Sequence, residues 1–484
     1  MMRKKPVLIS VLFLTALALL FSCATRSSKR FKKLSRAAEK KQYLSAIETI
    51  RKNPGMYGKT NQFLYFMDIG ALFHYAELYD SSNINLEKAV KVYDELFARS
   101  VTKEAASLLT NDNIRPYRSK PYEVVLMHQY LALNYMAMGK FNEALVETRR
   151  TQLLFNEWDR KDSKGVKYTN DPMFHYLSSI AYDAIDETDN SMISLFKSIE
   201  AYNQGVLSLP PEIKNFAYYM FQKNDRASDI DLLKIKADVS QEKVPGLQNN
   251  NSEIILVGYA GKGPALEEIS WWGTWVRDGM LVVHYNGPDG QEETVALPAP
   301  GLPEKEYQKA SKGKKTMSGT TFHIKFAMPV LKTFPSTTKY FTVRHNSLSS
   351  QKRSVVINDL DKMAAKHLED TRTATLIRTV IRVVLRTIAS QKTKSGLSGS
   401  NPLANLLVNV GTDVLADQLE KADTRSCFLI PKTVQIARIP VKPGTHNVEV
   451  TANGVSGQVI TSRAFNNIEV KANQKKFIFY SSLK

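Results

Sequence analysis

Ser194 stands three residues before Lys197, and Ser336 stands three residues before Lys339. The same spacing occurs in enzymes whose serine hydroxyl attacks an acyl group with a lysine nearby. The chain is rich in both residue types, so such pairs are expected by chance, and the first pair lies in a predicted repeat helix. The 8 histidines show no metal-ligand spacing on one helix. The sequence therefore predicts no catalytic residue, no metal and no cofactor.

The clearest chemistry belongs to Cys23, which follows an apolar run that begins at Val7. The basic residues 3–5 precede this run, as in a secretory leader, and the run is shorter than the ~20 apolar residues of a membrane-spanning helix. A small residue followed directly by cysteine resembles the lipobox of bacterial lipoproteins, whose cysteine is acylated and becomes the first residue of the mature chain. We therefore expect residues 1–22 to be removed and Cys23 to carry lipid. The alternative is an ordinary leader with an incidental cysteine.

Residues 23–36 are expected to form a basic tether behind this anchor. One acyl chain binds a bilayer only marginally, and a basic patch strengthens the attachment. Each basic residue near an anionic surface adds about 1 kcal/mol. A solvated, flexible tether without lipid contacts is the alternative. The candidate membrane-contacting residues are Arg26, Lys29, Arg30, Lys32 and Lys33.

The residue after Cys23 indicates the membrane, the net charge indicates the kind of partner, and the cysteine count indicates the state of Cys427. Ala24 is not the Asp that in similar lipoproteins favours the inner membrane, so the resemblance implies an outer-membrane anchor with the body in the periplasm or, alternatively, facing outward. The formal net charge of +19 over 484 residues indicates acidic partners, such as anionic lipid, a wall polymer or an acidic protein surface. An exported chain is not expected to bind nucleic acid. An acylated Cys23 leaves Cys427 unpaired, and its apolar neighbours predict a buried thiol.

Residues 37–236 have apolar residues at spacings of three and four and are predicted to be helical. One stretch matches the tetratricopeptide repeat (TPR), in which small residues let two helices approach, aromatic residues fill the gap and glycine makes the turn. Its matching residues are Ala132, Tyr135, Gly139, Phe141 and Ala144. Looser units surround it, one with an enlarged turn expected at residues 80–85 and one near Ser179 that lacks the turn glycine. A TPR-like array is favoured over an unrelated helical bundle.

TPR arrays stack into a curved surface that can receive a peptide or a partner protein. On this basis, aromatic residues of the predicted units are candidates for partner binding. These candidates are Tyr75, Tyr135, Phe141 and Tyr182. The alternative is that the concave face packs only against the protein's own second half.

The second half is predicted to be rich in strands. A linker at 237–252 leads to a β-rich region at 253–345, an insertion of two helices at 355–422 and a C-terminal β lobe at 428–484. The last lobe is expected to complete the sheet that begins at Glu253, in a sandwich-like module that folds separately from the array. The predicted fold class is therefore α+β.

Two features of the second half have more than one interpretation. Three tryptophans beside the first strand could stack on a sugar, lie at a membrane interface or anchor the core. They are Trp271, Trp272 and Trp275. An arginine ridge on the first inserted helix suits either anionic lipid or the wet face of a core helix. It consists of Arg378, Arg382 and Arg386.

The lipobox, the array, the strand and turn at 254–264 and the stretch at 430–446 together resemble a poorly characterised family of bacterial TPR-bearing lipoproteins. The resemblance covers most of the mature chain and brings no catalytic residue. It implies a role in envelope assembly, beside lipoprotein activators of wall-synthesising enzymes. We therefore expect a non-enzymatic, lipid-anchored scaffold that binds an envelope protein. The alternatives are a hydrolase that acts on the wall or on glycan and a structural subunit of a larger envelope complex.

Overall fold

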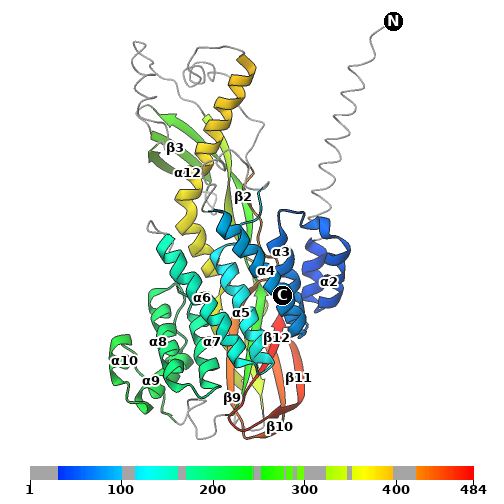
Figure 1. The fold of residues 1–484 in the computed structure, drawn as a ribbon, viewed down its shortest axis with the longest axis vertical. Coiled ribbons are helices and arrows are strands. Elements are labelled where there is room, and N and C mark those ends of the chain that lie inside the picture. Colours follow the sequence, from blue (N-terminus) through cyan, green and yellow to red (C-terminus); the bar gives the residue numbers. More distant parts are fainter. Residues whose placement is uncertain are drawn as a thin grey trace.

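The computed structural model shows helices in the first half of the chain and mostly strands in the second (Figure 1), which confirms the α+β prediction. The described residues are 31–100, 115–161, 170–241, 244, 252–276, 280–286, 292–298, 323–345, 351–395 and 421–484. The predicted lipidation site Cys23, the basic residues up to Arg30 and almost all of the second inserted helix lie outside them. Lys32 and Lys33 are exposed on a helix at 31–39, so the last part of the segment expected to be a tether is helical.

The first half is a series of helical hairpins, as the TPR pattern predicts. The helix at 31–39 pairs with α2, and the following hairpins are α3 with α4, α5 with α6, α7 with α8 and α9 with α10. Their bounds are α2 (Tyr43–Lys52), α3 (Gln62–Tyr75), α4 (Tyr79–Ser100), α5 (Pro121–Ala137), α6 (Phe141–Lys161), α7 (Pro172–Asp183), α8 (Thr188–Gln204), α9 (Pro211–Lys223) and α10 (Ala227–Leu233), with a 3-10 turn η1 (Pro54–Met56). Proline opens α5, α7 and α9, where its missing N–H leaves no helical hydrogen bond unmade.

The same turn closes each of these hairpins. A residue with positive φ follows the first helix, and the next backbone N–H donates to the carbonyl five positions back, as in a Schellman motif. The positive-φ residues are Lys41, Glu77, Gly139, Asp186 and Asp225. The TPR glycine is therefore one of several residue types that serve this turn, and the unit without it turns at Asp186. The enlarged turn expected at residues 80–85 is wrong, because α4 begins at Tyr79.

Replacing Gly139 with alanine should lower the free energy of unfolding by about 1–2 kcal/mol, because a side chain disfavours the left-handed backbone region. Gly139 has φ +73°, and nothing lies within 4 Å of an added Cβ, so backbone strain is the only cost. Chemical denaturation of parent and variant measures the difference. Gly55→Ala is the matched control, because Gly55 is equally open but has no positive φ. An equal loss in both variants would contradict this explanation.

The described strands form three sheets of four strands each. We call them the central sheet (order β12-β1-β9-β8), the outer sheet (β11-β10-β6-β7) and the distal sheet (β4-β3-β2-β5). The strands are β1 (Glu253–Lys262), β2 (Ala265–Val276), β3 (Met280–Asn286), β4 (Glu292–Pro298), β5 (His323–Lys332), β6 (Tyr340–Arg344), β7 (Lys352–Arg353), β8 (Val355–Asp359), β9 (Pro431–Pro440), β10 (Gly444–Asn453), β11 (Val459–Val470) and β12 (Lys475–Ser482). β1 pairs antiparallel with β9 and parallel with β12, so the C-terminal lobe and the strand at Glu253 share one sheet.

β1 lies in the middle of the molecule and is buried on both faces. Alternate residues of a strand point to opposite sides. Three apolar residues face the array helices, namely Ile255, Val257 and Tyr259, and three face the outer sheet, namely Ile254, Leu256 and Ala260. This double burial is the physical reason for the unbroken apolar run that marks β1 in the sequence. Gly258 lets the layers approach closely, since a Cβ there would lie 2.4 Å from the Phe341 ring.

The array, the central sheet and the outer sheet therefore form consecutive layers. One hydrophobic core extends from the array helices into the central sheet, where Phe477 and Phe479 belong to it. A second core lies between the central and outer sheets. The expectation that the β-rich half folds separately is wrong, because the central sheet has two apolar faces and the array covers one of them.

A buried ion cluster also joins the array to the central sheet. Arg438 of β9 donates to both carboxylate oxygens of Glu253 on β1, over 2.8 and 3.0 Å. The Nζ of Lys475 on β12 lies 2.9 Å from a carboxylate oxygen of Asp183 on α7. The Arg438 guanidinium lies 4.4 Å from the centre of the Phe216 ring on α9. These charges connect strands from both ends of the β-rich half to two array helices.

α12 (Leu360–Ser395) follows β8 directly and packs on β5 and α5. Together with the distal sheet it extends past one end of the array (Figure 1). Arg378 is exposed on this helix, whereas the side chains of Arg382 and Arg386 lie outside the described residues. No helix in the described part of the chain is long and apolar enough to cross a membrane.

β2 is a strand that the sequence did not predict. It carries the three tryptophans, and its register with β5 places Trp271 and Trp275 on one face of the distal sheet and Trp272 on the other. Their side chains lie outside the described residues, so their role stays a prediction.

Candidate protein-binding groove

The middle of the array's inner face is covered. α5 buries almost all of its 17 residues. The central sheet contacts one side of this helix and neighbouring helices contact the other. Of the two alternatives for the concave face, the structure shows the one in which it packs against the protein's own second half.

Tyr75, one of the predicted partner-binding residues, is engaged inside the protein. Its hydroxyl donates to the backbone carbonyl of Leu429 over 2.9 Å and lies 2.7 Å from the Tyr130 hydroxyl. Since Tyr75 donates to the carbonyl, Tyr130 donates to Tyr75. Burial is the main cause that raises the pKa of Tyr75 well above its usual value. The hydroxyl of Tyr75 is therefore not available to a partner, although its ring reaches a groove described below.

The other three predicted residues also contact the protein itself. The ring centre of Phe141 lies 6.5 Å from that of Phe477 on β12. Tyr135 and Tyr182 are half-buried against the core that the array shares with the central sheet. The structure does not bring the four residues together into one surface.

His74 on α3 ties the array to β1 through a buried polar network that the sequence did not indicate. Its Nδ1 lies 2.5 Å from Oδ1 of Asn134, and its Nε2 lies 2.6 Å from the Tyr259 hydroxyl. The Asn134 amide donates to Ser82 and Asn83, so its Oδ1 is an acceptor. His74 therefore carries its proton on Nδ1 and accepts from Tyr259 on Nε2. Such a ring must stay neutral, and burial lowers its pKa to about 4.

The protein should lose stability as the pH falls from about 6.5 to 4. His74 takes up a proton near its ordinary pKa of 6.5 when unfolded but only near 4 when folded, so protons favour the unfolded state in this window. The His74 contribution is present in full above pH 6.5 and reaches a loss of about 3 kcal/mol below pH 4. Urea unfolding at several pH values measures it. His74→Gln should flatten this pH dependence, and an unchanged slope in that variant would contradict the assignment.

A groove opens where the first hairpins meet the edge of the central sheet. It has a volume of about 680 Å³, and we call it the β12 groove. Its lining includes Lys41, Tyr43, Leu44, Tyr75, Glu77, Tyr259, Arg463, Phe479 and Tyr480. Two of the hairpin turns with a positive-φ residue, those at Lys41 and Glu77, therefore lie at its rim.

The groove has aromatic walls and a basic rim. The Lys41 ammonium lies 3.8 Å from the centre of the Tyr480 ring. Burial, followed by the nearby charges of Arg463 and Lys484, lowers the pKa of Lys41 to about 8, while Glu77 acts in the opposite direction. Glu77 forms an ion pair with Arg463. Since that pair neutralises the acid, the charge left at the rim is positive.

β12 forms an edge of the central sheet beside this groove. It pairs with β1 on one side, and in the strand order no described strand lies on the other. An edge strand presents backbone N–H and C=O groups that can pair with an added strand. The groove therefore combines aromatic walls, cationic side chains and a strand edge, which are the elements of peptide recognition by strand addition.

The residues considered for metal binding and for acyl transfer can be located in the described part of the chain. No cluster of three or more His, Cys, Asp or Glu side chains suited to a metal ion occurs among them. Ser336 Oγ donates to the carbonyl of Thr338, and Ser194 is buried in α8; in this part of the chain neither serine makes a hydrogen bond to the lysine that follows it. Cys427 is buried, as predicted.

No protein-family model and no curated protein matches the chain. Among solved structures, the apo form of RapI is similar to 42% of this chain, with 14% identity, a TM-score of 0.31 and 50% of RapI covered. A putative kinesin light chain from Podospora anserina with nearly identical TPR-like repeats is similar to 43%, with 14% identity, a TM-score of 0.30 and 92% of that chain covered. BtubC from P. vanneervenii is similar to 45%, with 12% identity, a TM-score of 0.26 and 90% of it covered. The hairpins and their shared turn, and not these scores, identify the array as TPR-like.

Proposed function

We propose that this protein is a non-enzymatic, lipid-anchored scaffold of the cell envelope. Its ligand is an extended, acidic segment of a partner protein, which binds in the β12 groove. The observation that carries the proposal is the edge of β12 beside a groove with aromatic walls and a positive rim. The segment adds to the sheet through its backbone, and its acidic side chains meet Lys41 and Arg463.

The central sheet covers the inner face of the array, where a TPR protein would be expected to bind its partner, so we place the partner at the edge of the sheet instead. The array packs against one face of the central sheet, and the edge strand β12 borders the groove. The backbone of β12 supplies affinity without sequence preference, whereas side-chain contacts in the groove supply selectivity. The choice of an acidic segment follows from the three cations Lys41, Arg463 and Lys484 around the single acid Glu77.

The anchor rests on the sequence of the leader and on acylation of Cys23. Cys23→Ala should abolish incorporation of labelled palmitate and release the protein from the membrane fraction, because the basic residues alone bind lipid weakly. Label on the purified protein measures the first effect, and fractionation at physiological and high salt, with the parent alongside, measures the second. A variant that stays with the membrane at high salt would contradict lipid anchoring.

The binding site is tested by selecting random displayed peptides on the full mature chain. The selected peptides should be rich in Asp and Glu and bind the parent directly. Lys41→Glu should weaken their binding by about tenfold or more, because it places a like charge at the groove rim. Lys40→Glu is the matched control, because Lys40 is exposed and adjacent in sequence but does not line the groove.

Two results would contradict this site. One is a set of selected peptides without acidic enrichment. The other is equal weakening by the Lys41 and Lys40 variants, which would show a response to net charge alone.

A further inference from the structure

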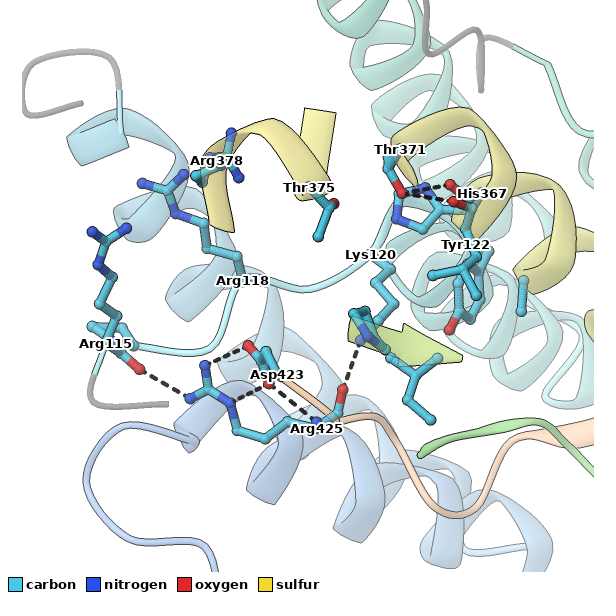
Figure 2. A pocket seen from close by; sticks show the side chains of 15 residues that line it. Arg115, Arg118, Lys120, Tyr122, His367, Thr371, Thr375, Arg378, Asp423 and Arg425 are labelled. Carbon is cyan, nitrogen blue, oxygen red and sulfur yellow. Dashed lines mark hydrogen bonds and ion pairs between the residues drawn. The ribbon is translucent and has the colours of Figure 1, made fainter. Parts of the chain in front are cut away.

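A second pocket lies where the segment before α5 meets α12, and it differs in character from the β12 groove (Figure 2). Its volume is about 190 Å³, roughly six times the ~30 Å³ share of one water molecule in the liquid. Five cationic side chains line it against one carboxylate, Asp423. The cations are Arg115, Arg118, Lys120, Arg378 and Arg425. We call it the arginine pocket.

Two of these cations and the carboxylate have structural partners. Arg425 donates to both oxygens of Asp423, over 2.8 and 2.7 Å, which neutralises the one acid of the lining. Arg425 also donates to the carbonyl of Arg115. Lys120 donates to the carbonyl of Arg425 over 2.7 Å and to the Tyr117 hydroxyl over 2.6 Å. These bonds make a rigid base for the pocket.

Arg118 and Arg378, unlike Lys120 and Arg425, have no structural partner for their side chains in the part of the chain that the structure describes. Both are exposed, and within the described ranges of the chain neither makes an ion pair or a hydrogen bond through its side chain. They come from separate elements and lie on the same side of the pocket in Figure 2, next to Arg115. Unpaired guanidinium groups that share a pocket repel each other and raise the local concentration of anions.

One face of α12 adds the Thr375 hydroxyl to this charge, whereas the Thr371 hydroxyl donates to the carbonyl of His367 over 2.7 Å. Thr371, Thr375 and Arg378 all line the pocket, as their spacing of four and three residues on a helix allows. His367, one turn earlier, also lines it, and its Nδ1 is buried with no hydrogen-bond partner among the described residues. Burial, followed by the charge of Lys120, lowers the pKa of His367 to about 4, so the ring is neutral at physiological pH. A buried ring nitrogen without a partner is unusual.

We propose that the arginine pocket binds a phosphate group of an anionic ligand, held by Arg118 and Arg378 with the hydroxyl of Thr375 as a further donor. One guanidinium suffices for the two oxygens of a planar carboxylate. Donors that converge from the 115–120 segment and from α12 suit a tetrahedral group with three or more oxygens. The ligand is either the headgroup of an anionic phospholipid or a soluble phosphate ester. This binding is independent of the peptide groove.

The test uses inorganic pyrophosphate as the probe and the full mature chain in neutral detergent. Titration calorimetry at constant ionic strength should show one site. Arg118→Gln combined with Arg378→Gln should weaken binding by about tenfold or more, because two charge-assisted contacts are lost. Arg149→Gln is the matched control, an exposed arginine of α6 outside the pocket, and it should bind as the parent does.

Competition experiments then distinguish a phospholipid headgroup from a soluble phosphate ester as the natural ligand. Short-chain phosphatidylglycerol that displaces pyrophosphate at a lower concentration than glycerol phosphate supports a lipid headgroup, and the reverse order supports a soluble ester. Circular dichroism of the double variant should match the parent, since both arginines are exposed. No binding of pyrophosphate to the parent at millimolar concentration, or equal binding to parent and double variant, would overturn the proposal.

Discussion

Arg438→Ala should lower the free energy of unfolding by about 3–5 kcal/mol, which is the cost of leaving one member of a buried ion pair alone. Arg438 and Glu253 are 8% and 0% exposed, and two hydrogen bonds join them. Removing the guanidinium leaves the Glu253 carboxylate buried without its main partner and also removes the contact with Phe216. Urea unfolding followed by circular dichroism measures the loss.

The control for this prediction is an ion pair of the same residue types at the surface. Arg344 lies 3.6 Å from Glu449, and their side chains are 67% and 48% exposed. Exposed pairs contribute about 0–1 kcal/mol, so Arg344→Ala should change stability little. Arg438→Met together with Glu253→Leu should recover much of the loss, because it removes both charges of this pair and leaves Lys475 paired with Asp183. Similar losses for Arg344→Ala and Arg438→Ala would contradict the importance of burial.

Tyr259→Ala should cost about 3–5 kcal/mol, as for other large aromatic residues removed from a core. Tyr259 is 1% exposed. Its ring centre lies 5.3 Å from those of His74 and Tyr75 on the array and 6.4 Å from that of Phe479 on the neighbouring strand. Because this ring fills the core shared by array and sheet, helices and strands should lose stability together. Circular dichroism at helix and strand wavelengths should therefore report one transition with one shifted midpoint.

Tyr259→Phe separates packing from hydrogen bonding at the same position. It keeps the ring but leaves Nε2 of His74 without the Tyr259 hydroxyl, at a cost of about 1–3 kcal/mol. If Tyr259→Ala shifted only the strand signal, or unfolded the protein in two separate steps, the shared core would be the wrong description.

Both predictions concern the contact between array and sheet, on which the proposed function also depends. The array holds the central sheet through the shared core and the ion cluster, and the edge of β12 stays beside the groove. A protein weakened at Tyr259 or Arg438 should therefore also bind the selected acidic peptides less well near its unfolding midpoint. At low urea concentration, where the fold persists, binding should be nearly normal.

Local features of the sequence determined the elements of this protein. Apolar spacing of three and four indicated the helices, and Gly139 with its small and aromatic neighbours indicated the TPR-like hairpin, because a left-handed turn favours glycine. The uninterrupted apolar run of β1 indicated a buried strand. Where local signals were weaker, predictions failed. The turn at Glu77 has no glycine and was expected as an enlarged turn at residues 80–85, and β2 was missed because Glu267 and Glu268 are polar and exposed within it.

Tertiary structure alone decided how these elements are combined. Strand pairing depends on backbone hydrogen bonds that most sequences can make, so nothing local in β1 indicates its parallel pairing with β12, which begins more than two hundred residues later. That pairing places Phe477 and Phe479 beneath the array and covers the face on which a partner was expected. The β12 groove and the arginine pocket each join segments from both halves of the chain, and only the folded chain brings them together. The predicted leader and the predicted acylation of Cys23 are the opposite case, because these predictions rest on consecutive residues and need no fold.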